Sequence, residues 1–438
     1  MIQVPESRYK KRRDNILRRI QGEALLLVSA SNKVKSRDQE FPYQQESNFY
    51  YLTGFNEPGA ALLLLGNQSK KKSVLFVKKS NPLHEKFEGK KTSLKEASRK
   101  FQIDEVYHTE QLALLLPKLI SDATCLHTVP GANPDIDSFI WELFKTPIGP
   151  RATFPNRLSD ARLILAELRS VKDSDEIRCL QTAINATVLA FKKFAPELSK
   201  CKSEAHAAKL LETYFTEFGG ENTGFDTIVA QGKNATTLHH SPGSTEIRSG
   251  KGVLVDAGTT FQKYCADITR FYPVGKKFNQ AEADVYDAVR AALKVGVKKS
   301  KPGTTLNKIH NSVVASLVEN LKSLGILKGK KDNLLKKQSY RPYYMHRTSH
   351  FLGLDVHDIS KIAETKKSIQ SGYNLALTPG NVFTIEPGLY FDSDCKCPEL
   401  RGTGIRLEED VLITKSGCRV LSEQLEIERE DVEQLCLG

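Results

Sequence analysis

The sequence predicts an α/β (α+β) fold divided between two domains. A domain usually takes roughly 100–200 residues, so 438 residues leave room for two domains or three small ones. The first third alternates apolar runs of strand length with segments of helical periodicity, and the remainder alternates long amphipathic helices with strand-rich stretches. We therefore expect a mixed α/β domain over residues 1–170 and a second domain over residues 171–438.

Short strands between helices predict the first domain. Ala24–Ser29, Ala60–Leu65 and Ser73–Val77 are short apolar runs, as is typical of buried strands. Arg8–Ile20 and Glu110–Ser121 instead place apolar residues at helical spacing, with charges on the far side. A chain that mixes both kinds of segment indicates an α/β domain.

A polar, charged segment, Arg169–Glu176, marks the predicted boundary. Its second half, Lys172-Asp173-Ser174-Asp175-Glu176, stands just before a helical pattern and supplies capping residues for it. We expect the second domain to begin here.

The second domain alternates pairs of helices with strand-rich stretches. Apolar residues recur at helical spacing in Asp175–Phe194, Glu204–Phe218, Ala281–Val297 and Leu306–Leu324. Strand-rich stretches, Thr227–Tyr272 and Asn381–Thr414, follow the first and the second pair. This order suggests a duplicated unit, although no residue-level repeat supports one.

Composition excludes several classes of protein. Hydrophobic residues make up 39% of the chain, and no apolar run approaches the ~18–20 residues that span a bilayer. We expect no membrane association and a cytoplasmic location, because the basic stretch Lys10–Arg19 suits neither a secretory signal nor an acid-poor transit peptide. The eight cysteines are spread thinly, which favours reduced thiols. We interpret the close pair Cys395 and Cys397 as free thiols in a loop.

The net charge of +12 is a weak guide to partners. No aromatic residues are interleaved with the basic runs in the way that single-stranded nucleic acid requires. We interpret these runs as solvated surface and do not expect a nucleic-acid partner.

Two aspartates provide the first chemical signal. Asp256 ends the apolar run Val253–Val255, and Asp267 follows eleven positions later. A hairpin that turns near Phe261–Tyr264 would bring the two carboxylates together. Adjacent carboxylates need a counter-charge, commonly a divalent metal. Taken alone, the pair could also be two ordinary surface aspartates.

Three histidines lie within twelve residues: His346, His350 and His357. Because Phe351–Leu354 is apolar and follows His350 directly, we expect that imidazole at a buried edge. A lone histidine there would more often be a satisfied core residue. Three histidines in a chain that also carries suitable carboxylates favour a metal site.

Two glutamates complete the candidate set. Glu386 ends an apolar strand that stops at Pro387 and Gly388, and Glu408 follows Arg406 on the same face of an alternating strand. Four carboxylates and one imidazole form a hard, oxygen-rich ligand set. Such a set favours Mn²⁺, Zn²⁺, Co²⁺ or Fe²⁺ in a two-metal site over a thiolate zinc site.

At these positions the sequence resembles the Xaa-Pro aminopeptidases, the aminopeptidase P group of the pita-bread metallopeptidases. The motifs are Asp256-Ala257-Gly258, Asp267-Ile268-Thr269-Arg270, His346 to His350, Glu386-Pro387-Gly388 and Gly404 to Glu408. Upstream, Asn48 to Pro58 resembles the N-terminal domain of the same group, so the likeness runs from about Ser7 to beyond Leu412. Five motifs in family order leave little room for coincidence.

The resemblance implies a fold and a set of residue roles. It implies an N-terminal aminopeptidase P-type domain followed by a catalytic pita-bread domain, a curved antiparallel sheet covered by helices. The implied metal ligands are Asp256, Asp267, His350, Glu386 and Glu408. Glu386, His239, His346 and His357 are the implied catalytic residues, and His239, His357 and Arg406 are the implied substrate contacts. Arg347, Thr348, His240, Cys395 and Cys397 depart from the family pattern at positions that we expect at the rim.

The implied activity is that of a metal-dependent exopeptidase. It would hydrolyse the N-terminal Xaa-Pro bond with a hydroxide activated by two divalent metal ions per chain, most simply Mn²⁺. A prolidase-type Xaa-Pro dipeptidase is the close alternative, and a non-catalytic pita-bread binding protein is the alternative from another class. Peptides with proline second are the expected partners, together with further copies of the chain in a dimer or tetramer.

Overall fold

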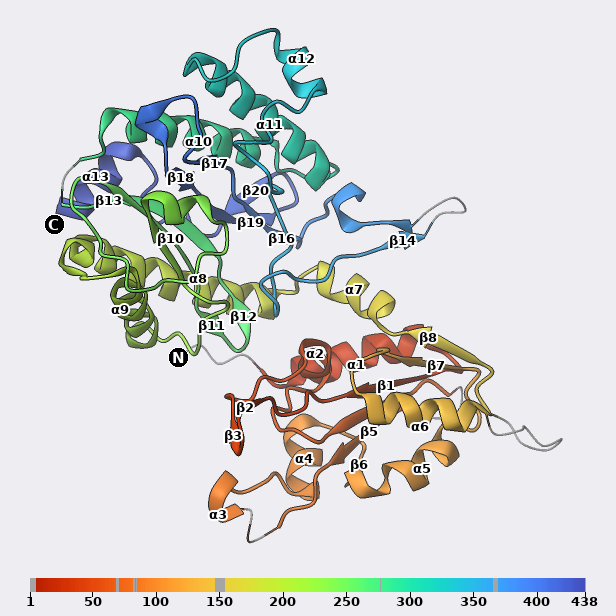
Figure 1. Cartoon of the computed structure of the whole chain (residues 1–438). Coiled ribbons are helices and arrows are strands. Elements are labelled where there is room, and N and C mark those ends of the chain that lie inside the picture. The colour runs from red at the N-terminus through yellow and green to blue at the C-terminus, as the bar shows by residue number, and fades with distance from the viewer. Residues whose placement is uncertain are drawn as a thin grey trace. The chain divides into compact units, whose positions relative to one another are not determined.

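A six-stranded sheet forms the centre of the first unit of the computed structural model (Figure 1). The chain divides into two compact units, Met1–Leu165 and Ala166–Gly438. The structure describes residues 5–67, 71–81, 83, 85–145, 154–275, 277–364 and 369–437. In spatial order the strands are β6 (Glu105–His108), β5 (Lys72–Val77), β4 (Ala61–Leu65), β1 (Ala24–Val28), β7 (Cys125–Thr128) and β8 (Arg157–Asp160). A separate hairpin joins β2 (Val34–Ser36) to β3 (Gln39–Glu40).

Helices pack on the sheet of the first unit. They are α1 (Ser7–Arg19), α2 (Ser47–Thr53), α4 (Leu94–Phe101), α5 (Leu112–Leu119) and α6 (Pro134–Lys145), with a 3₁₀ turn, η1, at Thr109–Gln111. The short helix α3 (Glu85–Glu88) has no buried residue. Leu26 and Leu63 share a core cluster with Leu116 of α5 and Ile140 of α6. The alternate residues of β1 and β4 are buried as well, which explains why these strands are apolar throughout.

The predicted strands of the first unit are confirmed to within one residue, as β1, β4 and β5. The helix expected at Arg8–Ile20 is α1, and the one expected at Glu110–Ser121 is divided between η1 and α5. The mixed sheet combines antiparallel pairs, β1 with β4 and β4 with β5, with parallel pairs on either side.

The helices of the second unit follow the sequence pattern closely. After α7 (Arg162–Ser170), which crosses the division between the units, come α8 (Ser174–Phe194), α9 (Glu204–Glu217), α10 (Gln280–Lys299), α11 (Leu306–Ser323), α12 (Lys331–Lys336) and α13 (Arg429–Leu437). Asp173 caps α8 by accepting from the backbone N–H of Glu176, whose side chain accepts from the Asp173 N–H. This capping box fixes the start of α8.

Every strand pair described in the second unit is antiparallel. One sheet contains β9 (Ile228–Gln231), β10 (Gly252–Ala257) and β13 (Ile268–Pro273), and another contains β16 (Val382–Ile385), β19 (Glu409–Ile413) and β20 (Cys418–Val420). Two-stranded pairs join β11 (Thr260–Phe261) to β12 (Tyr264–Cys265), β14 (Ala363–Glu364) to β15 (Ile369–Gln370), and β17 (Gly388–Phe391) to β18 (Thr403–Arg406). The remaining short elements are the 3₁₀ turns η2 (Ala195–Lys200), η3 (Gly232–Thr236), η4 (Gly372–Asn374) and η5 (Pro398–Leu400).

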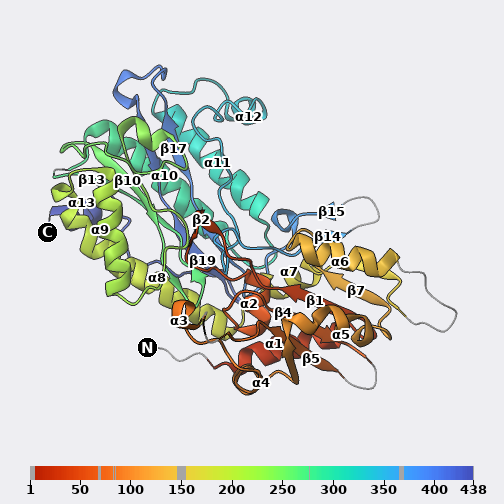
Figure 2. The same ribbon diagram turned by 60° about the horizontal axis from the view of Figure 1, so that its bottom comes forward.

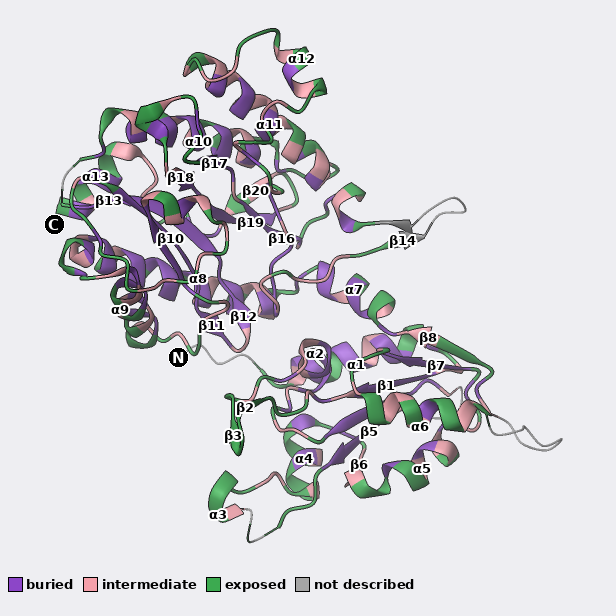
Figure 3. Cartoon of the chain, in the orientation of Figure 1, coloured by how far each residue is buried: buried purple, intermediate pink, exposed green. Residues whose placement is uncertain are grey.

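Helices cover these strands. α8 contacts β11 and β12, α9 contacts β9, and α10 contacts β16, β17 and β18 while lying beside α11 (Figures 1 and 2). β10 and β13 are buried along their whole length (Figure 3). No helix among the described residues is long and apolar enough to cross a membrane.

Candidate active site

One cavity of the second unit, about 660 Å³ in volume, is lined by every residue that the sequence singled out for chemistry. These are His239, Asp256, Asp267, His346, His350, His357, Glu386, Arg406 and Glu408. They come from positions up to 169 residues apart, since 408 − 239 = 169, so the fold and not the local sequence assembles the set.

The β10–β13 hairpin brings the two aspartates together. Asp256 pairs with Thr269, which places Asp267 on the diagonal. The turn is at Gln262 and Lys263, whose φ values of 48° and 66° suit the type I′ geometry of tight hairpins. Gly258 is required here because a Cβ on it would lie 1.8 Å from the carbonyl oxygen of Ala266.

Two antiparallel strand pairs, β16 with β19 and β17 with β18, place the glutamates. Ile385 pairs with Glu409 and Gly388 pairs with Arg406, so Glu386 and Glu408 both lie at the break between consecutive strands. The Glu408 N–H donates to the Thr269 carbonyl oxygen at 3.1 Å, which connects this segment to β13. This hydrogen bond links the strands that carry the two aspartates to the strands that carry the two glutamates, which belong to separate sheets.

The histidine segment runs along the far side of β16. The Glu386 N–H donates to the carbonyl of Thr348 at 2.8 Å, and the Thr384 N–H donates to that of His350 at 2.9 Å. These bonds direct His350 to the carboxylates: its Nε2 lies 3.2 Å from Asp267 Oδ2 and 3.7 Å from Glu386 Oε1. Its Nδ1 donates to the Phe351 carbonyl at 3.2 Å.

The ligand-type atoms converge most closely at three residues. Asp267, His350 and Glu408 each offer one atom within 4.8 Å of the other two. Asp256 and Glu386 couple electrostatically to this group. One oxygen of Asp256, Oδ1, is buried without a hydrogen-bond partner among the described residues. A buried carboxylate oxygen without a partner fits a bound cation, and the oxygen-rich donor set fits a hard divalent metal.

The carboxyl groups of the cavity resist ionisation without a counter-charge. Burial raises the pKa of Asp256 to about 6, with Arg406 opposing and Asp267 adding to the rise. Burial raises the pKa of Glu386 to about 7, and burial with the charge of Asp267 raises that of Glu408 well above its ordinary value. For His350 burial lowers the pKa, but Asp267 and Glu386 outweigh burial and raise it to about 9.

Arg406 connects the carboxylates to a hydrogen-bonded chain. Its guanidinium donates to Asp256 Oδ2 at 2.6 Å, to the Tyr390 hydroxyl oxygen at 2.9 Å and to Thr269 Oγ1 at 3.2 Å. The Thr269 hydroxyl in turn donates to Glu408 Oε2 at 2.8 Å. Arg406 is 4% exposed, so these bonds form away from solvent.

His346 is held as a neutral ring. Its Nδ1 donates to the Arg347 carbonyl at 2.7 Å, so Nε2 accepts from the Tyr390 hydroxyl at 2.9 Å. Burial, with the charge of Arg406, lowers the pKa of His346 to about 3. Its Nδ1 lies 3.6 Å from Glu386 Oε2, so the ring borders the carboxylate cluster.

The two other histidines lie elsewhere on the cavity wall. The ring of His357 meets that of His350 edge-on, with centroids 4.4 Å apart, and burial lowers the pKa of His357. His239 is exposed at the cavity wall. Neither belongs to the three-residue cluster of ligand atoms.

Two of the residues expected at the rim have buried partners. Thr348 is 0% exposed, and its hydroxyl contacts His310 Nδ1 at 2.8 Å and the Tyr344 hydroxyl at 2.7 Å. His240 Nε2 lies 2.8 Å from Glu204, which is 0% exposed. The expectation for Thr348 was wrong, because its hydroxyl is bonded within the core.

Sequence reasoning missed Asp410, Tyr390 and Thr269. Asp410 is 0% exposed, accepts from the Asp267 N–H at 3.1 Å, and has a pKa raised well above its usual value by burial and by Asp267. An acidic residue within the apolar run of β19 was the available signal for Asp410. Tyr390 and Thr269 had no such signal, because buried tyrosine and threonine in strands are ordinary.

Comparison with known proteins gives the family. Residues 178–415 match the model of metallopeptidase family M24, and residues 9–127 match the aminopeptidase P N-terminal domain. The chain belongs to the aminopeptidase P group of family M24. It is 34% identical to a Xaa-Pro aminopeptidase of Haemophilus influenzae, covering 99% of this chain and 98% of that protein. It is 33% identical to the Xaa-Pro aminopeptidase of Escherichia coli, covering 100% and 99%.

Solved structures of this family agree with the fold. Aminopeptidase P from Escherichia coli with the inhibitor Pro-Leu aligns with a TM-score of 0.92 at 32% identity, covering 100% of this chain and 99% of that one. A zinc-substituted form of the same enzyme in complex with product aligns with a TM-score of 0.93 and the same coverage. The expected fold, a mixed α/β domain followed by a pita-bread domain, is confirmed.

Proposed function

We propose that this metallopeptidase is an exopeptidase that removes the first residue from peptides with proline in the second position. The observation that carries the proposal is the convergence of Asp267, His350 and Glu408, with Asp256 and Glu386 beside them, in one cavity. The relatives named Xaa-Pro aminopeptidase, and the structure of one of them with Pro-Leu, support this choice of substrate.

Asp256, Asp267, His350, Glu386 and Glu408 would hold two divalent metal ions. A pair of ions in such a site supplies a nucleophilic water of lowered pKa and polarises the scissile carbonyl. We propose Mn²⁺, because four carboxylates and one imidazole suit a hard ion and affinity alone does not select among the first-row metals.

The surrounding residues handle protons and orientation. Glu386 is proposed as the acceptor of the proton from the attacking water. The uncharged His346 beside it would take part by exchanging its bond with the Tyr390 hydroxyl for one with a bound peptide. His239 and His357 line the same cavity from other segments and would orient the substrate, His357 from its place against His350. Arg406 would contact the substrate while it compensates the charge of Asp256.

The walls of the cavity suit a prolyl ring. Apolar side chains line it, among them Phe225, Leu238, Phe351 and Val356. A prolyl residue within a peptide has no N–H to donate, so shape must distinguish it. A cavity of about 660 Å³ lies within the range of small-ligand sites.

The test is hydrolysis of an Arg-Pro-Pro peptide by chelator-stripped protein, with and without Mn²⁺. We expect Mn²⁺ to restore release of arginine alone, with about two ions bound per chain. Asp267→Ala should reduce kcat/KM by at least about 100-fold, since even outer-shell residues are worth 10–100-fold. Asp284→Ala, an exposed aspartate on α10, should retain activity.

Three outcomes would contradict the proposal. Cleavage of the dipeptide Arg-Pro without cleavage of the tripeptide would indicate a prolidase. Full metal occupancy without cleavage would indicate a non-catalytic binding protein. Unimpaired cleavage by Asp267→Ala would overturn the assignment of that residue.

The remaining proposals concern organisation. We propose a dimer or tetramer, to be measured by sedimentation of the metal-loaded protein. The cytoplasm is the compartment we propose, because all eight cysteines are free thiols. The domain boundary that we propose at residues 170 and 171 coincides with the end of α7.

A further inference from the structure

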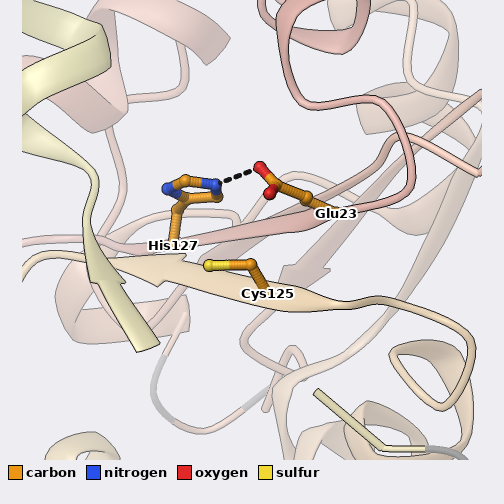
Figure 4. A group of neighbouring side chains, drawn as sticks. All are labelled: Glu23, Cys125 and His127. Carbon is orange, nitrogen blue, oxygen red and sulfur yellow. Dashed lines mark hydrogen bonds and ion pairs between the residues drawn. The ribbon is translucent and has the colours of Figure 1, made fainter. Parts of the chain in front are cut away.

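We propose that Glu23, Cys125 and His127 of the first unit form a second metal site, specific for zinc, that is separate from the catalytic cavity. One ligand atom of each residue lies within 4.8 Å of the other two. Figure 4 shows the three side chains gathered at one place above β7. The inference does not depend on the proposed peptidase activity.

Neighbouring strands create this cluster. Cys125 and His127 are alternate residues of β7, so both side chains point to the same face of the sheet. β7 runs parallel to β1, and Leu126 lies opposite Ala24. Glu23 immediately precedes Ala24 in the chain, which brings it beside Cys125. Three different ligand types therefore meet on a rigid part of the sheet, which favours a well-defined site.

The spacing suits a tetrahedral ion after a small adjustment. Zinc bonds of about 2.0–2.3 Å place tetrahedral ligand atoms about 3.3–3.8 Å apart. His127 Nε2 lies 2.7 Å from Glu23 Oε2, so the ion would replace this direct contact and separate the two atoms slightly. Three protein ligands leave a fourth position for water.

The charges of the three ligands match a divalent zinc ion. Cys125 and His127 are 3% and 7% exposed. A thiolate and a carboxylate together neutralise Zn²⁺, so the occupied site carries no net buried charge. Sulfur, nitrogen and oxygen ligands in one set fit borderline-soft Zn²⁺, whereas the catalytic cavity has no cysteine among its lining residues.

The position of Arg157 also supports the site. Arg157 donates to Glu23 Oε1 at 2.9 Å, which orients the carboxylate and leaves Oε2 for the cluster.

The alternative of a cysteine nucleophile does not fit. Burial, and then the charge of Glu23, raises the pKa of the Cys125 thiol. A nucleophilic cysteine requires a lowered pKa and access to solvent, and Cys125 has neither.

Cobalt absorption tests the proposal on the full chain. We expect chelator-stripped protein to develop a thiolate-to-Co²⁺ charge-transfer band in the near ultraviolet when Co²⁺ is added. The band should persist in Asp267→Ala, which lacks a proposed catalytic ligand, and disappear in Cys125→Ser. Added Zn²⁺ should displace the signal, and bound zinc in Cys125→Ser should fall by about one ion per chain, as a three-ligand site requires.

Cys397→Ser is the matched control, because the closely spaced thiols Cys395 and Cys397 are the alternative source of a thiolate ligand for Co²⁺. It should keep the band. His127→Gln and Glu23→Gln should weaken Co²⁺ binding at least tenfold, and circular dichroism of each variant checks that it is folded. Absence of the band in the wild-type protein, or its loss in Cys397→Ser with retention in Cys125→Ser, would overturn the inference. Loss of peptidase activity in Asp267→Ala bears only on the proposed function.

Discussion

Tyr390 shows how a single hydroxyl can set the state of the cavity. It accepts from Arg406 and donates to His346, so it connects the compensating cation to a neutral imidazole. Tyr390→Phe should lower kcat about 10–100-fold with a smaller effect on KM, because a hydrogen bond to a charged group contributes about 1.5–3 kcal/mol. Steady-state kinetics on the Mn²⁺-loaded enzyme measures both constants.

Tyr343→Phe is the matched control for Tyr390→Phe. Tyr343 packs against Phe391 with ring centroids 5.5 Å apart and an interplanar angle of 45°, and it is not among the residues that line the cavity. Kinetics of Tyr390→Phe equal to those of Tyr343→Phe would show that the Arg406–Tyr390–His346 chain has no part in the reaction.

His310 should make the protein acid-sensitive. Burial, with the charge of Arg347, lowers its pKa to about 4, against about 6.5 in the unfolded chain. Between these values the unfolded chain binds a proton that the folded chain does not, so stability falls as pH falls. Urea unfolding of metal-free protein at pH 7.5 and pH 5 should show a smaller loss for His310→Asn than for wild type. His206→Asn, at an exposed position of α9, should lose as much as wild type.

At the scale of the elements, a buried ion-pair network fixes the loop that carries His357. Asp358 follows His357 directly, and its side chain, 1% exposed, pairs with Arg169 and with Lys172 Nζ, the latter at 2.8 Å. A Cβ on Gly353 would lie 2.0 Å from Asp358 Oδ2, so the loop closes tightly on this carboxylate. Burial alone would raise the pKa of Asp358, but Arg169 and Lys172 lower it.

Lys172→Met should destabilise the protein by about 3 kcal/mol, the low end for removing one partner of a buried pair, because Arg169 remains. The stability that Asp358 contributes through these ion pairs is fully present above about pH 3.9, the pKa of an aspartate in the unfolded chain. It is lost as the pH falls through the lower pKa of Asp358 in the folded chain. Urea unfolding at pH 7 measures the change. Lys209→Met removes an exposed pair with Glu212 on α9 and should cost less than about 1 kcal/mol. Equal effects of the two substitutions would argue against a buried network.

The elements also show which features the sequence could predict. The apolar runs of β1, β4 and β5 and the long helices α8 to α11 were predictable because burial requires a continuous or periodic apolar pattern. β8, Arg157–Asp160, has only exposed and half-buried residues, so no apolar run marks it in the sequence. Hairpin pairing predicted that Asp256 and Asp267 meet, but the contact of Glu408 with β13 depends on strand order, which no local pattern contains.

At the scale of the whole molecule, bound metal should determine the pH range of stability. In metal-free protein burial raises the pKa values of Asp256 and Glu386 to about 6 and about 7, and it raises the pKa of Glu408 well above its ordinary value. Unfolded carboxyl groups titrate near 3.9–4.3. Between those values the folded chain holds more protons than the unfolded chain, so these groups make metal-free protein less stable as pH rises. A cation in the cavity removes the repulsion.

The gain in melting temperature on adding Mn²⁺ should therefore increase from pH 5 to pH 8 at a fixed concentration of free metal. Thermal unfolding in the Cys125→Ser background excludes a contribution from the proposed zinc site. Titration of His310, which is common to both metal states, cancels in the difference. Glu386→Gln should flatten the pH dependence because it removes one of the carboxyl groups with a raised pKa. A gain that stays constant or decreases with pH would mean that electrostatic repulsion among these carboxylates does not govern the stability of the metal-free fold.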